Sequence, residues 1–252
     1  MTRAVIHGCN GKMGQVITRL AKEDGGIQIV AGVDRYQGIA NDYPVFSDMA
    51  SCDVEADVVI DFSSAEAVDA LLDACMEKKL PLVLCTTGLS GEQLEKVEKA
   101  KKNIAILRSA NMSVGVNLLL KLLKEAAAVL GPAGYDIEIV EKHHNKKVDA
   151  PSGTALALAD SINDALDGAY SYVYDRSQVR KPREKTEIGI SAVRGGTITG
   201  QHDVIFAGED EVIEFQHTAY SKNVFAKGAL EAAKFLAGKP AGGYGMEDVI
   251  QF

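Results

Sequence analysis

The sequence predicts an α/β fold: a doubly wound parallel sheet interrupted by an inserted α+β domain on a mixed, mostly antiparallel sheet. Three observations lead to this prediction. Short apolar runs alternate with amphipathic stretches through the first part of the chain, as parallel strands joined by helices do. A glycine-rich turn, GCNGKMG, follows the first of these runs. After Met112 the pattern changes to one long amphipathic stretch and then to strand-like alternation.

The first part of the chain reads as strands that each lead into a turn and, in most cases, a helix. Ser63 and Ser64 are candidate N-caps for the helix expected at 66–79. The expected strands are 4–7, 27–35, 56–64, 80–88 and 103–111, and the expected helices lie around 16–21, at 66–79 and at 91–102. This order predicts a Rossmann-like sheet.

The glycine turn has a physical task in such a sheet. Gly8, Gly11 and Gly14 precede a helix, where backbone N–H groups can bind a pyrophosphate that Cβ atoms would obstruct. The spacing is GxxGxxG, with Asn10 where a middle glycine is common, and glycine turns after strands are often only turns. Asp34 ends the second strand, where an acidic residue binds a ribose hydroxyl, so the context favours dinucleotide binding.

Arg35 bears on which dinucleotide is used. A guanidinium beside the ribose site can bind a 2′-phosphate and favours NADP, whereas Asp34 favours NAD. The pair indicates use of NADH, NADPH or both, although Arg35 could equally be a solvated surface charge. The segments 85–88 (CTTG) and 109–117 (SANMSVGVN) follow later strands and are expected to face the nicotinamide, unless they are ordinary loops.

The second part begins with a helix at 116–131, ended by Gly131 and Pro132. The run 135–144 alternates as a half-buried strand does, Ser152 is a good N-cap, and 154–166 reads as a helix. Strands are expected within 187–220, a surface loop at 170–185, and a helix near 223–238 before a closing segment at 243–250. The expected domains are 1–113 plus 223–252, which would bind the dinucleotide, and 114–222, which would bind the substrate.

The stretch EKHHNKKVDAPSGTA, residues 141–155, concentrates polar chemistry beside a helix start. His143 and His144 offer a general acid or base near neutral pH. Lys147 can bind a carboxylate or protonate an imine nitrogen, and Gly153 and Thr154 begin a helix whose N–H groups bind anions. The alternative is one core histidine, one solvated histidine and solvated lysines. The whole constellation favours a site for a small carboxylate.

Composition limits the other classes of function. The net charge is −8 and the isoelectric point about 5.2, which argues against nucleic acid or an anionic membrane as a partner. The 4 cysteines are widely spaced without a CxxC, which indicates free thiols, a cytoplasmic protein and no metal site. No signal peptide and no apolar run long enough to span a bilayer are visible.

These motifs together resemble the 4-hydroxy-tetrahydrodipicolinate reductase family, also called dihydrodipicolinate reductase. The stretch 141–155 is similar to the family signature E-x-H-H-x-x-K-x-D-A-P-S-G-T-A, and GCNGKMG is similar to its nucleotide loop. The segments TTG, SANMSVGVN and VRGGTITGQH also fit, so the resemblance spans essentially the whole chain. It implies an NAD(P)H-dependent oxidoreductase of diaminopimelate and lysine biosynthesis, usually a homotetramer built through the sheets of the second domain.

The resemblance also implies roles for individual residues. His143 would be the general acid/base and Lys147 the proton donor, with His144, Gly153 and Thr154 on the substrate carboxylates. The implied cofactor contacts are Gly8, Gly11, Lys12, Met13, Gly14, Asp34, Arg35, Cys85, Thr87, Ala110 and Met112. Lys222 stands where some members have arginine, so a bidentate clamp is not expected there. Two other functions stay open: a nicotinamide-binding redox sensor, and a related dehydrogenase acting on another small carboxylate.

Overall fold

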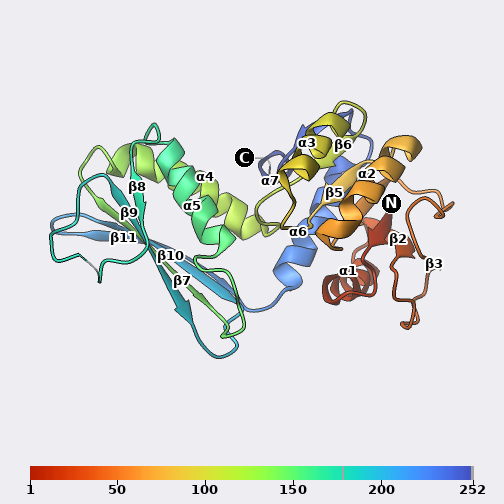
Figure 1. Cartoon of the computed structure of the whole chain (residues 1–252), viewed down its shortest axis with the longest axis horizontal. Helices are drawn as coiled ribbons and strands as arrows, with labels where there is room; N and C mark the ends of the chain where they lie inside the picture. Colours follow the sequence, from red (N-terminus) through yellow and green to blue (C-terminus); the bar gives the residue numbers. More distant parts are fainter. Residues whose placement is uncertain (178, 251–252) are drawn as a thin grey trace. The chain divides into compact units, whose positions relative to one another are not determined.

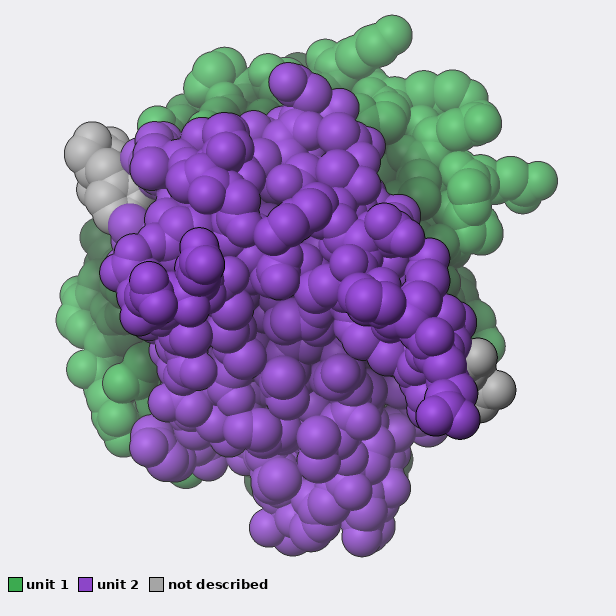
Figure 2. Space-filling model, turned by 90° about the vertical axis from the view of Figure 1, so that its left-hand side faces the viewer, with its two compact units in different colours: residues 1–114, 222–252 green, residues 115–221 purple. Residues whose placement is uncertain are grey.

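The computed structural model describes residues 1–177 and 179–250 of the chain and divides them into two compact units (Figure 1). Unit 1 comprises residues 1–114 and 222–252, and unit 2 comprises residues 115–221, as coloured in Figure 2. The second unit is therefore an insertion into the first. No helix among the described residues is long and apolar enough to cross a membrane.

Unit 1 is built on a seven-stranded parallel sheet in the order β12-β6-β5-β4-β1-β2-β3. Its first elements are β1 (Thr2–His7), α1 (Lys12–Glu23), β2 (Ile27–Val33), β3 (Val45–Phe46), β4 (Val58–Asp61) and α2 (Ala65–Lys78). The rest are β5 (Leu82–Leu84), α3 (Gly91–Ala100), β6 (Ala105–Leu107), α6 (Asn223–Leu236), β12 (Gly242–Tyr244) and α7 (Met246–Val249). The predicted doubly wound sheet is confirmed.

Alternation along β1 explains why helices cover both faces of this sheet. Ala4 and Ile6 pack into a core with α1 and α6, whereas Val5 packs into a second core with α2 and α3. All three side chains are fully buried, as parallel strands sandwiched between helices require. The turn that follows β1 and the turns after β2 and β4 therefore meet at one edge of the sheet, where a ligand can bind.

Unit 2 pairs a five-stranded sheet with two helices. Its elements are α4 (Val114–Leu130, whose first residue belongs to unit 1), β7 (Asp136–His143), α5 (Gly153–Asp164), β8 (Ser171–Val173), β9 (Glu187–Arg194), β10 (Gly200–Ala207) and β11 (Val212–Ala219). The order is β11-β10-β7-β9-β8. The β11–β10–β7 pairings are antiparallel and the β7–β9–β8 pairings are parallel, which confirms a mixed sheet.

Strand β7 supplies the buried face of this sheet by strict alternation. Ile137 and Ile139 lie in a core with Leu123 of α4 and Leu158 of α5. Glu141 continues the same buried row, as does His143 at the end of the strand. The buried side chains of β7 therefore change from apolar to polar toward its C-terminal end, where the stretch 141–155 begins. This change places Glu141 and His143 at one end of the core.

Three local predictions need correction. The segment 170–185, expected as a surface loop, contains the short edge strand β8, which pairs with β9. Strand β3 was not predicted, because two residues are too few to show a period. Ser64 occupies the N-cap position of α2 as predicted, but its side chain caps no backbone group there.

Candidate active site

The glycine turn of unit 1 brings backbone N–H groups to the start of α1. Gly8 has φ of 83°, which favours glycine, and a Cβ there would lie 2.7 Å from the carbonyl oxygen of Phe62. A Cβ on Gly14 would collide with the carbonyl oxygens of Gly8 and Cys9. Gly11 is the N-cap of α1 and offers no side-chain cap, and no acidic residue lies in the first turn. The helix N-terminus is therefore free to bind an anion.

Asp34 is held in place beside this turn. Its two carboxylate oxygens accept hydrogen bonds from the backbone N–H groups of Asn10 and Tyr36, each at 2.9 Å. Arg35 is exposed, and within the described part of the chain no hydrogen bond or ion pair involves its guanidinium. A fixed carboxylate and an adjacent exposed cation are the two groups that can distinguish a ribose hydroxyl from a 2′-phosphate.

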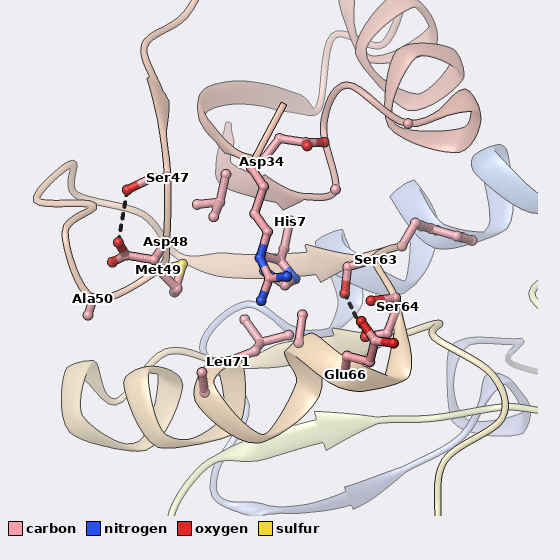
Figure 3. A pocket seen from close by; sticks show the side chains of 17 residues that line it. His7, Asp34, Ser47, Asp48, Met49, Ala50, Ser63, Ser64, Glu66 and Leu71 are labelled. Atoms are coloured by element: carbon pink, nitrogen blue, oxygen red, sulfur yellow. Dashed lines mark hydrogen bonds between the residues drawn. The ribbon is translucent and has the colours of Figure 1, made fainter. Parts of the chain in front are cut away.

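A cavity of about 580 Å³ opens beside these residues, between the ends of β1, β2 and β4 and the helix α2 (Figure 3). Four of the predicted cofactor residues line it: Gly8, Gly11, Asp34 and Arg35. Its remaining walls are mostly apolar, with Val33, Met49 and Leu71 among them. A slot of this kind suits a flat aromatic ring whose sugar and phosphates continue toward Asp34 and the α1 N-terminus.

The other predicted cofactor residues do not line this cavity. Lys12 and Met13 lie on the first turn of α1, exposed and half-buried respectively. Cys85 and Thr87 follow β5, and Ala110 and Met112 follow β6, at the same carboxyl edge of the sheet. The Met112 side chain is buried in the core with α6, so only its backbone remains for contact with a ligand.

In unit 2, His143 is fixed by a buried carboxylate. Its Nδ1 lies 2.6 Å from Oε2 of Glu141, which is completely buried. Arg194 of β9 binds both oxygens of Glu141 at 2.7 Å, and the Ser152 N–H donates to Oε1 at 2.9 Å. Burial alone would raise the pKa of Glu141, but these hydrogen bonds outweigh it and hold that pKa below its usual range.

This arrangement sets the protonation of His143. Burial lowers the pKa of His143 below its ordinary value, and the Glu141 carboxylate opposes that shift only in part. In the resulting neutral ring, Nδ1–H donates to Glu141 and Nε2 is an acceptor. A Cβ on Gly200 would lie 3.1 Å from Nε2, so a glycine at this position leaves room for the imidazole.

The signature stretch brings its other predicted residues close to His143 in the sequence and structure. His144 ends the strand region half-buried, and its buried Nδ1 has no hydrogen-bond partner among the described residues. The Lys147 ammonium lies 2.7 and 2.8 Å from the two oxygens of Asp149, and this lysine lowers the pKa of Asp149. Two of the three ammonium N–H donors are therefore directed at Asp149, which leaves one for a substrate.

The N-terminus of helix α5 lies at the same end of unit 2. Ser152 caps the helix by accepting a hydrogen bond from the Ala155 N–H at 3.0 Å. Gly153 is exposed with nothing near the position of a Cβ, and Thr154 follows it half-buried. The Gly153 backbone hydrogen-bonds the Asp149 carboxylate and helps to lower its pKa, so the helix end already stabilises a carboxylate of the chain itself.

Two members of this network, Arg194 and His202, were not predicted as site residues. His202 lies on β10, its Nε2 is 2.9 Å from the Ser152 hydroxyl, and its ring meets that of His143 edge-on at 5.2 Å. The sequence did give a signal for His202, because alternation along β10 places it on the same buried face as Val204 and Phe206. Arg194 gave no such signal, since its contact with Glu141 depends on the parallel pairing of β9 with β7.

We expect stability to fall on mild acidification because of His202. Burial, with a smaller contribution from neighbouring His143, lowers its pKa from 6.5 to about 4. Between those values the unfolded chain binds more protons, so the free energy of unfolding falls as pH drops from 6.5 toward 4, by on the order of 3 kcal/mol. Urea unfolding at pH 7.5 and pH 5 measures this change. The His202→Gln variant should lose less stability between the two pH values than the wild type. An equal loss in both proteins would show that His202 is not its cause.

The cysteines remain outside the chemistry. Burial raises the pKa of Cys9 to about 11 and of Cys75 to about 12, and it also raises the pKa of Cys85. These thiols are therefore protonated at neutral pH and do not act as nucleophiles. Among the described residues no group of histidine, cysteine or acidic side chains is placed to hold a metal ion.

The two units, one with a Rossmann-like sheet and one inserted into it, match those of a class of NAD(P)H-dependent oxidoreductases. Two family profiles cover nearly the whole chain, dihydrodipicolinate reductase N-terminus at residues 2–112 and dihydrodipicolinate reductase C-terminus at residues 115–250. The chain belongs to the dihydrodipicolinate reductase family.

Relatives of known name agree with this assignment. The chain is 56% identical over 251 residues to the 4-hydroxy-tetrahydrodipicolinate reductase of Caldanaerobacter subterraneus subsp. tengcongensis, covering 100% of this chain and 99% of that protein. It is 54% identical over 250 residues to the protein of the same name from Clostridium tetani, covering 99% and 97%. Both matches extend through both units.

Two solved structures share the fold. Dipicolinate-bound dihydrodipicolinate reductase from Paenisporosarcina sp. TG-14 matches with a TM-score of 0.82 at 24% identity, covering 99% of this chain and 100% of that one. A myo-inositol dehydrogenase from Lactobacillus casei, in complex with NAD(H) and myo-inositol, matches with a TM-score of 0.61 at 18% identity, covering 99% and 90%. At these identities the likeness concerns the fold alone.

Proposed function

We propose that this protein reduces 4-hydroxy-tetrahydrodipicolinate, or its dehydrated form, to tetrahydrodipicolinate with NADH or NADPH, in diaminopimelate and lysine biosynthesis. Family membership supports the reaction class, and one structural observation carries the mechanism. That observation is the buried Glu141, which joins Arg194, His143 and the Ser152 N–H beside the N-terminus of α5. An imidazole oriented by a buried carboxylate beside a helix N-terminus supports a reaction on a ring that carries carboxylates.

The proposed cofactor contacts follow from unit 1. The free N–H groups at the start of α1, with Gly8, Gly11, Lys12, Met13 and Gly14, bind the pyrophosphate. Asp34 accepts from a ribose hydroxyl, and Arg35 pairs with a 2′-phosphate when NADPH is used. Cys85, Thr87, Ala110 and Met112 provide contacts along the adjoining strand ends. When bound, the nicotinamide supplies the hydride.

The proposed proton chemistry lies in unit 2. Loss of water from the substrate leaves a carbon–carbon double bond conjugated with the ring imine. Hydride addition at the carbon that carried the hydroxyl would leave an electron pair that takes up one proton at the other end of the conjugated system. Lys147 would donate that proton, and His143, whose Nε2 is an acceptor in the neutral ring, would act as acid/base in proton exchange with the substrate. His144, Gly153 and Thr154 hold the substrate carboxylates.

The test is NADH and NADPH oxidation with substrate generated from pyruvate and aspartate semialdehyde by a coupled synthase. Oxidation that depends on the synthase is expected for the wild type. We expect His143→Gln and Lys147→Ala each to lower turnover by on the order of 100-fold or more. Lys146→Ala is the matched control, since Lys146 is exposed beside them. Full turnover in either site variant would remove that residue from the mechanism.

Cofactor choice gives a separate prediction. Arg35→Ala is expected to raise the KM for NADPH by about tenfold, because one ion pair with a 2′-phosphate is lost. The KM for NADH should change by less than about twofold, since the ribose hydroxyl is left to Asp34. Steady-state kinetics with both cofactors measures this. Equal changes in the two KM values would show that Arg35 does not contact the 2′-phosphate.

Assembly and domain roles belong to the same proposal. We assign cofactor binding to 1–113 plus 223–252, and substrate binding and tetramer formation to 114–222. The uncovered face of the unit 2 sheet carries Val140 and Ile205 on neighbouring strands, and their apolar side chains support association through it. Sedimentation of the wild type and of a Val140→Asp variant tests this; a monomeric wild type would refute it.

A further inference from the structure

Within the cavity of unit 1, His7 stands apart from the other lining residues. It is the last residue of β1, it is 9% exposed, and it is the only polar residue of the lining described as buried. Figure 3 shows it between Asp34 and Leu71 in that view. The nucleotide-binding pattern of the sequence made no use of it, since the pattern begins at Gly8.

A buried carboxylate fixes the orientation of the His7 ring. Nδ1 lies 2.7 Å from Oδ1 of Asp61, which is completely buried at the end of the neighbouring strand β4. The two residues are paired in the sheet register, so the backbone itself sets their distance. Oδ1 also accepts from the Ser63 N–H at 3.2 Å. Because a carboxylate only accepts hydrogen bonds, Nδ1 carries the proton that it shares with Asp61.

The other ring nitrogen is left for a ligand. With Nδ1–H donating to Asp61, Nε2 is the ring nitrogen that can accept a hydrogen bond from a ligand. Among the described residues no hydrogen bond to Nε2 is formed, and this atom is not one of the fully enclosed polar atoms without a partner. Val33, Met49 and Leu71 give the cavity apolar walls, and the other polar residues that line it are less buried than His7. His7 therefore offers a buried acceptor to a flat heteroaromatic ring.

We propose that His7, oriented by Asp61, is a specificity-determining residue that recognises the exocyclic amine of the cofactor's adenine. The proposal rests on the assignment of the cofactor to this edge of unit 1. The adenine 6-amino group is a donor and matches the Nε2 acceptor. A 6-oxo purine presents another acceptor there and leaves Nε2 unpaired in a mostly apolar slot.

The experiment compares NADH with reduced nicotinamide hypoxanthine dinucleotide, which differs from it in carrying a 6-oxo purine. Dissociation constants are measured by calorimetry, without substrate, on the full chain. The wild type is expected to bind NADH at least about tenfold more tightly than the analogue, the equivalent of one hydrogen bond. In His7→Ala this ratio should fall to within about twofold, through weaker NADH binding.

Met49→Leu is the matched control. Met49 lines the same slot through an apolar side chain, so both dissociation constants should change by the same factor and the ratio should persist. If His7→Ala does not fold, His7→Gln, whose amide can still donate to Asp61, tests the same loss of discrimination. Equal affinity of the wild type for both dinucleotides, or full discrimination in a folded His7 variant, would overturn the proposal. Failure of the wild type to bind NADH would instead remove the cofactor assignment.

Discussion

Replacing Glu141 with glutamine is expected to lower turnover by on the order of 100-fold and to destabilise the fold by about 3 kcal/mol or more. The turnover falls because the carboxylate that orients the His143 ring is gone. The stability falls because Arg194, bound to both oxygens of Glu141, loses the charge that compensates its own. The side chain itself is completely buried, so water cannot replace it.

A pH profile separates this orienting role from simple destabilisation. Glu141 raises the pKa of His143 against the lowering effect of burial. In a folded Glu141→Gln protein, any limb of the rate profile that His143 causes should therefore shift to lower pH. Glu214→Gln is the matched control, because it makes the same change at an exposed position of β11. Turnover and pH profile close to wild type in the Glu141 variant would contradict the role.

Gly14→Ala is expected to disable the dinucleotide site. The added methyl group would overlap the carbonyl oxygens of Gly8 and Cys9, which are backbone atoms and cannot rotate away. The turn between β1 and α1 must then open. We expect a loss of about 1–3 kcal/mol in stability and a rise of tenfold or more in the dissociation constant for NADH. Calorimetry and urea unfolding measure the two effects.

Gly25→Ala serves as the control for that change. Gly25 lies in the turn between α1 and β2, and a Cβ there meets nothing within 4 Å. Stability and NADH binding in this variant should stay close to wild type. If Gly14→Ala were equally neutral, close backbone packing would not be the reason for glycine at that position.

Local patterns predicted much of the fold and of the candidate site. The alternation of apolar runs and helices placed the strands of unit 1, and the run 135–144 was recognised as a half-buried strand from its period alone. The signature stretch contains His143, His144, Lys147, Gly153 and Thr154, and these residues do gather around the end of β7 and the start of α5. Their roles in the reaction stay predictions.

Pairing between distant strands lay beyond such patterns. The chain runs from β9 directly to β10, yet β7 lies between them in the sheet. That order carries Arg194 of β9 and His202 of β10 to opposite sides of the strand that ends at His143. Neither neighbour could be inferred from spacing, because a crossover leaves no period in the sequence.

By itself, the sequence determined the two kinds of sheet, the glycine turn with Asp34, and the signature stretch beside a helix. These features depend on residue types at short separations, which local periodicity and turn chemistry report directly. Only the tertiary structure decided that Glu141 is a buried bridge from Arg194 to His143, and that His7 meets Asp61 beneath a cavity. The Arg194–Glu141 and His7–Asp61 pairs join residues on different strands, and their energies depend on burial, which arises only when the sheets are assembled.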